Sequence, residues 1–114
     1  MSDLASEKCV PCGPGTAPLR GAELAALAAK LPQWSVVNEH HLQREYRFKN
    51  FAHALIFVNS AGIVAEEQKH HPEITFTWGR ATVRVWTHSI DGLARGDFVL
   101  AAKIERLYES TARE

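Results

Sequence analysis

The sequence predicts an α+β fold: a single domain in which a four-stranded antiparallel sheet has helices packed on one face. Three observations favour this fold class. Two pairs of segments alternate between apolar and polar residues, as strands do, and a short turn joins each pair. Three further segments carry strong helix formers or apolar residues at helical spacing. The expected order is helix, two strands, helix, two strands, helix, and such hairpins favour an antiparallel sheet.

The first three elements are expected in the N-terminal half of the chain. Residues 22–31 are rich in alanine and leucine, and Pro32 ends the helix that they predict. Residues 34–38 and 42–48 then predict a first hairpin, which turns near residues 39–40.

The second helix is expected to begin after Asn50, which is a suitable N-cap residue. Apolar and small residues recur at helical spacing over residues 51–65. Residues 55–58 are apolar nearly all round, which predicts a helix buried on more than one side. Pro72 prevents further helix and favours an extended His71, so the helix leads directly into the next strand.

A second hairpin is predicted by residues 74–78 and 82–88, which alternate strictly. Residues 79–80, Gly-Arg, fit a two-residue turn of type II′. This turn pairs Trp78 with Ala81 and places the apolar side chains of both strands on one face of the sheet.

Three histidines are expected to meet at the open end of this hairpin. The same register places His71 opposite His88, and the end of the second helix delivers His70 beside them. Glu66 lies four residues before His70 and is expected to orient it. Because imidazoles exchange protons near neutral pH, such a cluster indicates acid–base chemistry or a metal site.

The other aromatic and histidine residues receive no functional role from the sequence. His40, His41 and His53 are interpreted as solvated or core residues, and Trp78 as part of the core.

Length and composition exclude several classes of protein. A chain of 114 residues suits one domain, which can bury roughly 65% of its unfolded surface. Thirteen basic and thirteen acidic residues give zero formal net charge, so no nucleic-acid partner is expected. The chain has no apolar run of membrane-spanning length and no secretory signal pattern. We therefore expect no membrane partner and a cytoplasmic location.

Residues 1–18 are expected to form an irregular leader, and residues 19–114 the folded domain. The leader contains Cys9 and Cys12 in a C-x-x-C pattern. One such pair supplies only two of the four ligands of a closed zinc site. A redox pair would open a helix after a strand, which the Gly-Pro-Gly of residues 13–15 disfavours. We therefore expect a flexible tail with two reduced thiols.

Three runs of residues resemble a known family. They are Phe48-Lys49-Asn50-Phe51-x₂-Ala54, Ala65-Glu66-x₃-His70-His71-Pro72-Glu73 and Thr87-His88-x₃-Gly92-Leu93-x₃-Asp97. Over about residues 20 to 108 the chain resembles the pterin-4a-carbinolamine dehydratases, also called 4a-hydroxytetrahydrobiopterin dehydratases. The resemblance implies a lyase, without cofactor or metal, that dehydrates a 4a-hydroxy-tetrahydropterin to the quinonoid dihydropterin. This reaction restores the cofactor of aromatic amino-acid hydroxylases.

The resemblance assigns the histidine cluster to catalysis. We expect His70 and His88 to transfer protons and His71 to bind or assist. The sequence does not assign which histidine is the acid and which is the base. Trp86 is expected to stack on the flat pterin. The expected substrate-binding residues, by side chain or backbone, are Glu66, Lys69, Trp86, Thr87, Ser89 and Asp97.

The last helix is expected over residues 97–109, and its start departs from the family pattern. Ala94 stands where the family often has a serine that would cap this helix together with Asp97. Gly96 replaces a frequent arginine, although Arg95 precedes it. These departures concern the roles of Asp97 and of the nearby arginine, and they leave the histidines intact.

Two alternatives from other classes remain open. One is a non-enzymatic protein-binding or dimerisation cofactor, because an animal member of the family serves a homeodomain transcription factor in this way. The other is a metal-binding protein that uses His70, His71, His88 and the two thiols.

A homo-oligomer is expected, either a dimer or a tetramer. The chain is small, its second helix is apolar on more than one side, and an open sheet leaves edge strands that need cover. We expect Leu55, Ile56 or Phe57 to be divided between the core and a subunit contact.

Overall fold

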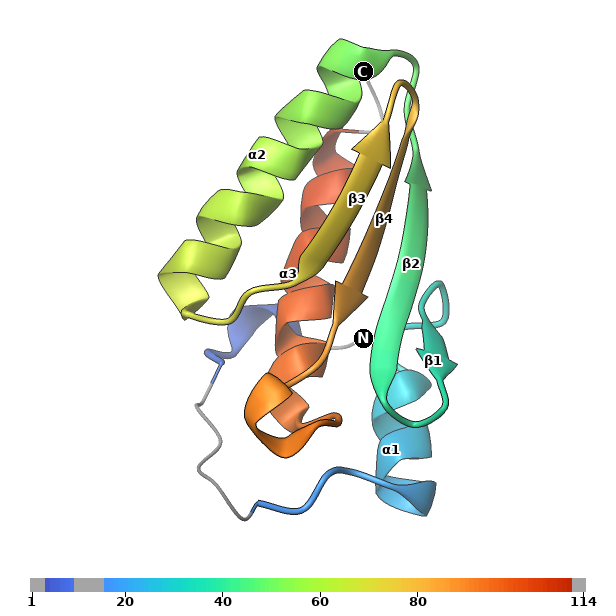
Figure 1. Ribbon diagram of the computed structural model, residues 1–114, viewed down its shortest axis with the longest axis vertical. Helices are drawn as coiled ribbons and strands as arrows, with labels where there is room; N and C mark the ends of the chain where they lie inside the picture. Colours follow the sequence, from blue (N-terminus) through green and yellow to red (C-terminus); the bar gives the residue numbers. More distant parts are fainter. Residues whose placement is uncertain (1–3, 10–15, 112–114) are drawn as a thin grey trace.

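The predicted order of helices and strands is confirmed in the computed structural model, which describes residues 4–9 and 16–111 (Figure 1). The helices are α1 (Gly21–Ala28), α2 (Phe51–Gln68) and α3 (Arg95–Thr111), with short 3-10 helices η1 (Leu4–Ser6) and η2 (His88–Ile90). The strands are β1 (Ser35–Val37), β2 (His41–Arg47), β3 (Glu73–Thr77) and β4 (Arg80–Val85). They form one antiparallel sheet in the order β1-β2-β4-β3.

Helices α2 and α3 pack on one face of this sheet, as predicted (Figure 1). Alternation along β2 and β4 sends one set of side chains toward the helices, where they are almost completely buried. This set is Leu42, Tyr46, Ala81, Val83 and Val85. The other face of the sheet carries polar residues such as Thr82 and Arg84 and is not covered by the helices. Among the described residues, no helix has both the length and the apolar character needed to cross a bilayer.

The register predicted for the second hairpin is wrong by two residues. Thr77 pairs with Arg80, so the turn consists of Trp78 and Gly79. Because the shift is even, every strand residue keeps the face that the sequence predicted. Trp78, however, moves out of the strand and is 64% exposed, so its interpretation as a core residue is also wrong.

Gly79 is required here by a close approach of backbone rather than by a turn of type II′. Its carbonyl accepts a hydrogen bond of 2.9 Å from the backbone N–H of Phe48. A Cβ atom at Gly79 would lie 3.0 Å from the Phe48 carbonyl oxygen, closer than side chains normally come. The absence of a side chain at Gly79 therefore leaves room for the backbone of Phe48, which follows β2. From the sequence, the glycine was wrongly interpreted as a sign of the turn type.

The corrected hairpin changes the position of the histidines. Strand β4 ends at Val85, and His88 begins η2 instead of continuing the strand. His71 lies before the first residue of β3, so the predicted pairing of His71 with His88 is wrong. Their approach depends on the segments that follow α2 and β4, not on the ladder of the sheet.

The first hairpin turns through Asn38 and Glu39, one residue earlier than predicted. Both residues have φ of 53°, in the left-handed region. The backbone N–H of His40 donates to the Val37 carbonyl at 2.9 Å, which closes a two-residue turn. This geometry places His40 and His41 at the end of the sheet that also carries η2.

Residues 4–9 of the leader are packed against the domain, so the expectation of a flexible tail is wrong for this part. Leu4 is 1% exposed and belongs to the core. Lys103 of α3 donates to the Ala5 carbonyl at 2.8 Å, and Arg95 forms a two-pronged ion pair with Glu7, at 2.9 and 2.6 Å. The predicted thiol of Cys12 and the Gly-Pro-Gly segment lie outside the described residues.

Candidate functional site

The C-terminal end of α2 positions the first histidine. The backbone N–H of His70 donates to the Ala65 carbonyl at 3.1 Å, and that of Lys69 donates to Glu66 at 3.2 Å. This pair of hydrogen bonds is the Schellman motif, in which the residue after the helix adopts the left-handed conformation. Here that residue is Lys69, with φ of 54°, where glycine is usual. The reversal turns His70 out of the helical path and toward α3.

His70 is held by a buried carboxylate. Its Nε2 forms a short hydrogen bond with Oδ1 of Asp97, whose side chain is fully buried. Asp97 Oδ2 accepts two further hydrogen bonds, from the Thr87 hydroxyl and from the Ala94 backbone N–H, both at 2.8 Å. In neutral His70 the proton therefore sits on Nε2, which leaves Nδ1 with a lone pair. A carboxylate placed in this way fixes the tautomer and stabilises a protonated ring.

The side chain of Asp97, which is expected to bind substrate, is buried and binds three protein groups, one of which is His70. It also caps α3, since its carboxylate accepts the backbone N–H of Ala94 as the acidic residue of a capping box does. The serine hydroxyl that Ala94 lacks is thus only one half of the cap, and the other half is present.

Glu66 contacts His71 instead of His70. Glu66 Oε2 lies 2.5 Å from His71 Nε2, and both side chains are mostly exposed. The predicted pairing of Glu66 with His70 assumed that the helix continues through His70. Because α2 ends at Gln68 and the chain then reverses, the four-residue spacing no longer places the two side chains on one face.

His88 lies beside Trp86 on the segment after β4. The two ring centroids are 4.3 Å apart with an angle of 32° between the rings, so this face of Trp86 is covered by an imidazole. Thr87 between them is buried, and its hydroxyl donates to Asp97. The Thr87 N–H and carbonyl bond to the backbone of Gly92. Thr87 is also an expected substrate-binding residue, and its backbone N–H and carbonyl already have partners within the protein.

A cavity of about 310 Å³ brings most of the predicted site residues together. Its walls are Lys69, His70, His71, Trp86, Thr87, His88 and Ser89. All three predicted catalytic histidines are among them. Glu66 and Asp97 do not line the cavity, but their carboxylates bond to His71 and His70, which do.

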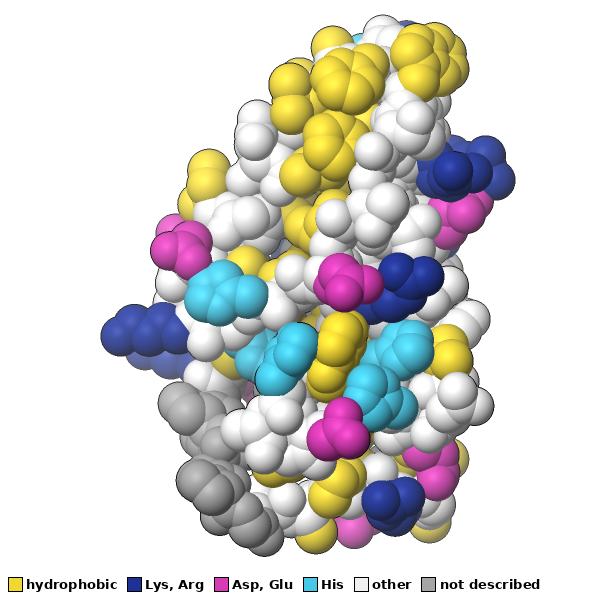
Figure 2. All heavy atoms as spheres, in the orientation of Figure 1, with side chains coloured by type: hydrophobic (Ala, Val, Ile, Leu, Met, Phe, Trp, Pro, Cys, Tyr) yellow, Lys and Arg dark blue, Asp and Glu magenta, His cyan; other side chains and the backbone are white. Residues whose placement is uncertain are grey.

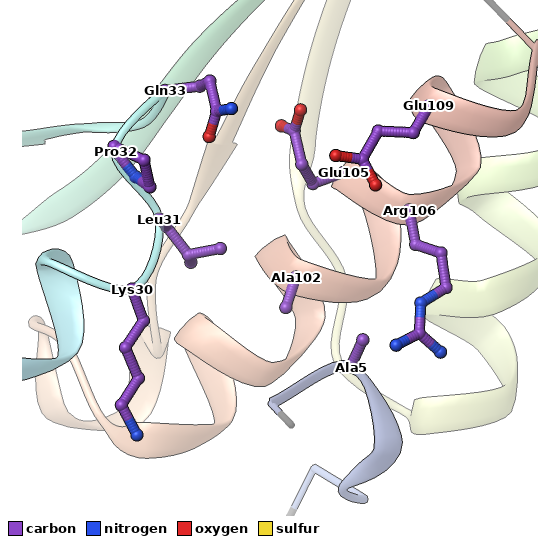
Figure 3. Close-up of a pocket in the computed structure, with 9 residues that line it drawn as sticks. All are labelled: Ala5, Lys30, Leu31, Pro32, Gln33, Ala102, Glu105, Arg106 and Glu109. Atoms are coloured by element: carbon purple, nitrogen blue, oxygen red, sulfur yellow. The ribbon is translucent and has the colours of Figure 1, made fainter. Parts of the chain in front are cut away.

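A somewhat larger cavity, of about 390 Å³, lies elsewhere, between the segment after α1, η1 and α3 (Figure 3). Its residues are Ala5, Lys30, Leu31, Pro32, Gln33, Ala102, Glu105, Arg106 and Glu109. No histidine lines it. The carboxylate of Glu105 already accepts hydrogen bonds from Trp34, Arg44 and Tyr46, at 3.0, 3.0 and 2.9 Å. The histidine cavity is therefore the better candidate for chemistry, although it is the smaller of the two.

Sequence reasoning missed the position of Cys9. Its backbone N–H donates to the Gln68 side chain at 2.9 Å, and its thiol donates to the Gly96 carbonyl at 3.4 Å. Cys9 thus joins the end of α2 to the start of α3, next to His70 and Asp97. Burial raises the pKa of the Cys9 thiol to about 11, and the negative charge of Asp97 adds to the shift. The C-x-x-C pattern drew attention to metal and redox chemistry and carried no signal of this contact.

The metal-binding alternative gains no support from this geometry. Within residues 4–9 and 16–111, no group of three or more His, Cys, Asp or Glu side chains is arranged to hold a metal ion.

Comparisons with known proteins point to one family. A family model described as "Pterin 4 alpha carbinolamine dehydratase" matches residues 17–107. A Rubrobacter xylanophilus protein named "Putative pterin-4-alpha-carbinolamine dehydratase" is 60% identical, over 94% of this chain and 100% of its own length. A protein of the same name from Alkaliphilus metalliredigens is 45% identical, over 93% and 96%.

Two solved structures share the fold. A transcriptional coactivator/pterin dehydratase from Brucella melitensis matches with a TM-score of 0.75 and 30% identity, over 79% of this chain and 97% of its own. A pterin dehydratase-like protein, identified as a RuBisCO assembly factor in the alpha-carboxysome, matches with a TM-score of 0.57 and 19% identity. The second covers 66% of this chain and 91% of its own, and shows likeness of fold alone.

Proposed function

Because the chain belongs to the pterin 4 alpha carbinolamine dehydratase family, we propose that it dehydrates 4a-hydroxytetrahydrobiopterin, or a close pterin relative, to the quinonoid dihydropterin. This step is part of the regeneration of tetrahydrobiopterin after its use by a hydroxylase, and a separate two-electron reduction of the quinonoid product completes that regeneration. The observation that carries the proposal is the convergence of His70, His71 and His88 on one cavity, with His70 held by a buried carboxylate.

The reaction needs one proton delivered and one removed. The bond between C4a and its hydroxyl oxygen breaks, the oxygen leaves as water after gaining a proton, and the pterin ring nitrogens lose a proton. His70 is suited to accept the proton, because Asp97 keeps Nε2 protonated and stabilises the imidazolium that forms. His88, which is exposed at the other side of the cavity, then donates to the leaving oxygen.

The remaining cavity residues bind and orient the flat substrate. His71 is held by Glu66 and assists at the exposed rim, while Lys69 and Ser89 offer polar groups to the edge of the pterin. Trp86 provides apolar surface at its uncovered parts. No covalent intermediate is required, because the two proton transfers and the departure of water complete the reaction. We place the reaction in the cytoplasm.

Turnover of freshly generated 4a-hydroxy-tetrahydropterin, with and without the protein, tests this proposal directly. His70→Ala and His88→Ala should each lower kcat by about 10²–10⁴-fold, the usual contribution of a positioned acid or base. His53→Ala is the matched control, because His53 lies at the start of α2 and bonds to Asn50, away from the cavity. Wild-type rates in both His70 and His88 variants would exclude this mechanism.

We also propose that the protein is a homo-oligomer, a dimer or a tetramer. Large apolar side chains of α2 are exposed, namely Phe51 (46%), Leu55 (39%), Ile56 (56%) and Ile63 (61%). Phe57 is fully buried and belongs to the core. Figure 2 shows hydrophobic side chains gathered over α2 and the β3–β4 turn. Light scattering of wild type and of Ile56→Glu tests the assembly, which a 12.7 kDa monomer at micromolar concentration would exclude.

Binding of another protein is the second candidate function. The same exposed apolar residues of α2 favour it, and the Brucella melitensis structure carries the word coactivator in its name. Co-purification of a partner with wild type, and its loss with Ile56→Glu, would support this role. Dehydratase activity of the Ile56→Glu variant tells the two functions apart, because Ile56 lies outside the histidine cavity.

A further inference from the structure

The β1–β2 turn brings a second pair of histidines next to the candidate active site. The ring centroids of His40 and His41 lie 5.3 and 5.8 Å from that of Trp86, and His88 lies 4.3 Å from it. Figure 2 shows histidine side chains gathered on both sides of one hydrophobic side chain on this face. Trp86 therefore links the two groups of imidazoles. Nothing in the sequence distinguishes His40 and His41 from ordinary solvated or core residues.

His40 is attached to the segment of His88 by two separate contacts. Its Nε2 lies 2.8 Å from Oδ1 of Asp91, and its ring lies against Trp86. Asp91 ends η2, the short helix that begins with His88, and its backbone N–H donates to the His88 carbonyl at 3.2 Å. Trp86 precedes His88 by two residues. The two contacts thus hold this segment on both sides of the histidine.

Both ring nitrogens of His40 lie within hydrogen-bonding distance of a neighbouring side chain. Its Nδ1 lies 3.0 Å from Nδ1 of His41. Burial lowers the pKa of His41, and the positive charges of His40 and Arg84 lower it further. If His40 Nε2 donates to the Asp91 carboxylate, the Nδ1 of a neutral His40 can accept a hydrogen bond from Nδ1 of His41. Both ring nitrogens of His40 are then occupied, so its ring cannot rotate without losing one of the two bonds.

His88 needs such support more than the other cavity histidines do. His70 is bonded to Asp97 and His71 to Glu66. Within the described residues, the His88 imidazole has the ring contact with Trp86 and no carboxylate partner. Aromatic pairs have preferred relative geometries, so the position of Trp86 helps to set the plane of the exposed His88 ring.

We propose that His40 is a positioning residue, which holds Trp86 and η2 so that His88 faces the cavity. This inference rests on the proposed function, because it assumes that His88 transfers a proton. It extends the functional site to the β1–β2 turn, 48 residues before His88 in the chain and outside the three runs that resemble the dehydratase family. Proper placement of a proton donor matters strongly, since a shift of about 1 Å can cost about 100-fold in rate.

Three variants and one control test the proposal. His40→Ala removes both contacts, His40→Phe keeps a ring beside Trp86, and Asp91→Asn keeps a hydrogen bond but removes the charge. His53→Ala again controls for the loss of a histidine elsewhere. We expect His40→Ala to lower kcat between about tenfold and about 100-fold and to raise KM by a smaller factor, because the displaced Trp86 also offers apolar surface to the substrate. His40→Phe and Asp91→Asn should each retain part of the rate.

Nitrogen NMR of the His88 imidazole gives a readout that does not depend on activity. In wild type and His53→Ala we expect a single set of nitrogen signals from the His88 ring. In His40→Ala we expect these signals to be shifted or broadened. An unchanged His88 spectrum in His40→Ala overturns the proposal, even if the wild type proves to have no dehydratase activity. If His40→Ala does not fold, the milder Asp91→Asn variant provides the test. A wild-type kcat together with a wild-type His88 spectrum in Asp91→Asn would then overturn the proposal.

Discussion

Replacing Asp97 with asparagine should separate the structural role of this residue from its role in catalysis. The asparagine oxygen can take the place of Asp97 Oδ2, where it still accepts from the Thr87 hydroxyl and the Ala94 N–H. The amide NH₂ then faces His70, where the carboxylate oxygen was. An amide nitrogen only donates, so His70 Nε2 must become an acceptor and its proton must move to Nδ1. The proposed base is thereby converted to the wrong tautomer.

The expected losses in the free energy of unfolding follow from the number of hydrogen bonds that each variant keeps. Asp97→Asn replaces the charge-assisted bond to His70, worth about 1.5–3 kcal/mol, by a neutral bond worth about 0.5–1.5 kcal/mol, and this loss is partly offset because no charge is buried any longer. We expect a net loss of about 1–2 kcal/mol in the free energy of unfolding. Asp97→Ala leaves the Thr87 hydroxyl and the Ala94 N–H buried without partners, each at about 1–3 kcal/mol, so it should lose about 2–6 kcal/mol.

Urea unfolding and dehydratase kinetics on the same samples measure both effects. Asp97→Asn should remain folded while its kcat falls by about 10²–10⁴-fold, with a smaller change in KM. The reasoning fails if this variant turns over at a rate near that of wild type. It also fails if the asparagine and alanine variants are equally destabilised, because the retained hydrogen bonds would then contribute nothing.

Three further predictions follow from other parts of the fold. Leu4→Ala should lower the free energy of unfolding, measured in urea, by about 2–4 kcal/mol, because Leu4 is part of the core. An unchanged free energy of unfolding would show that the leader is a free tail. Lys69→Gly should raise stability by about 1 kcal/mol by relieving the left-handed φ, yet raise KM, since the Lys69 side chain lines the cavity. Hydrogen bonding to Arg95 lowers the pKa of Glu7, so its contribution to stability is present above about pH 4.5 and lost in more acidic solution. Urea titrations of Glu7→Gln and wild type between about pH 3 and pH 6 should therefore converge at the acidic end.

The sequence predicted those parts of the fold that local patterns determine. Asn50 caps α2 as expected, and its side chain accepts the His53 N–H at 2.9 Å. The alternating strands assigned the correct faces, and therefore most of the core. The turn was wrong because the need for glycine at position 79 arises from the Phe48 backbone, a contact between segments about 30 residues apart.

The candidate site could be listed from the sequence, but its pairing could not. The motif collected the three histidines and both carboxylates, yet it paired Glu66 with the wrong histidine and gave Asp97 no histidine partner. Glu66 was expected beside His70, because nothing in Lys69 marks the end of a helix in the way that glycine does. Asp97 was expected at the substrate, because burial of a carboxylate depends on what three other segments offer it.

The contact between the start and the end of the chain has a consequence for biosynthesis. Leu4 and Glu7 find their partners on α3, and the backbone N–H of Leu19 donates to the Leu93 carbonyl at 2.8 Å. A ribosome adds about 5–20 residues per second and releases the N-terminal part first. The leader must therefore wait, exposed, for several seconds until α3 has emerged from the exit tunnel. Asp97 emerges with that same helix, so the hydrogen bond between His70 and Asp97 can form only after α3 has left the tunnel.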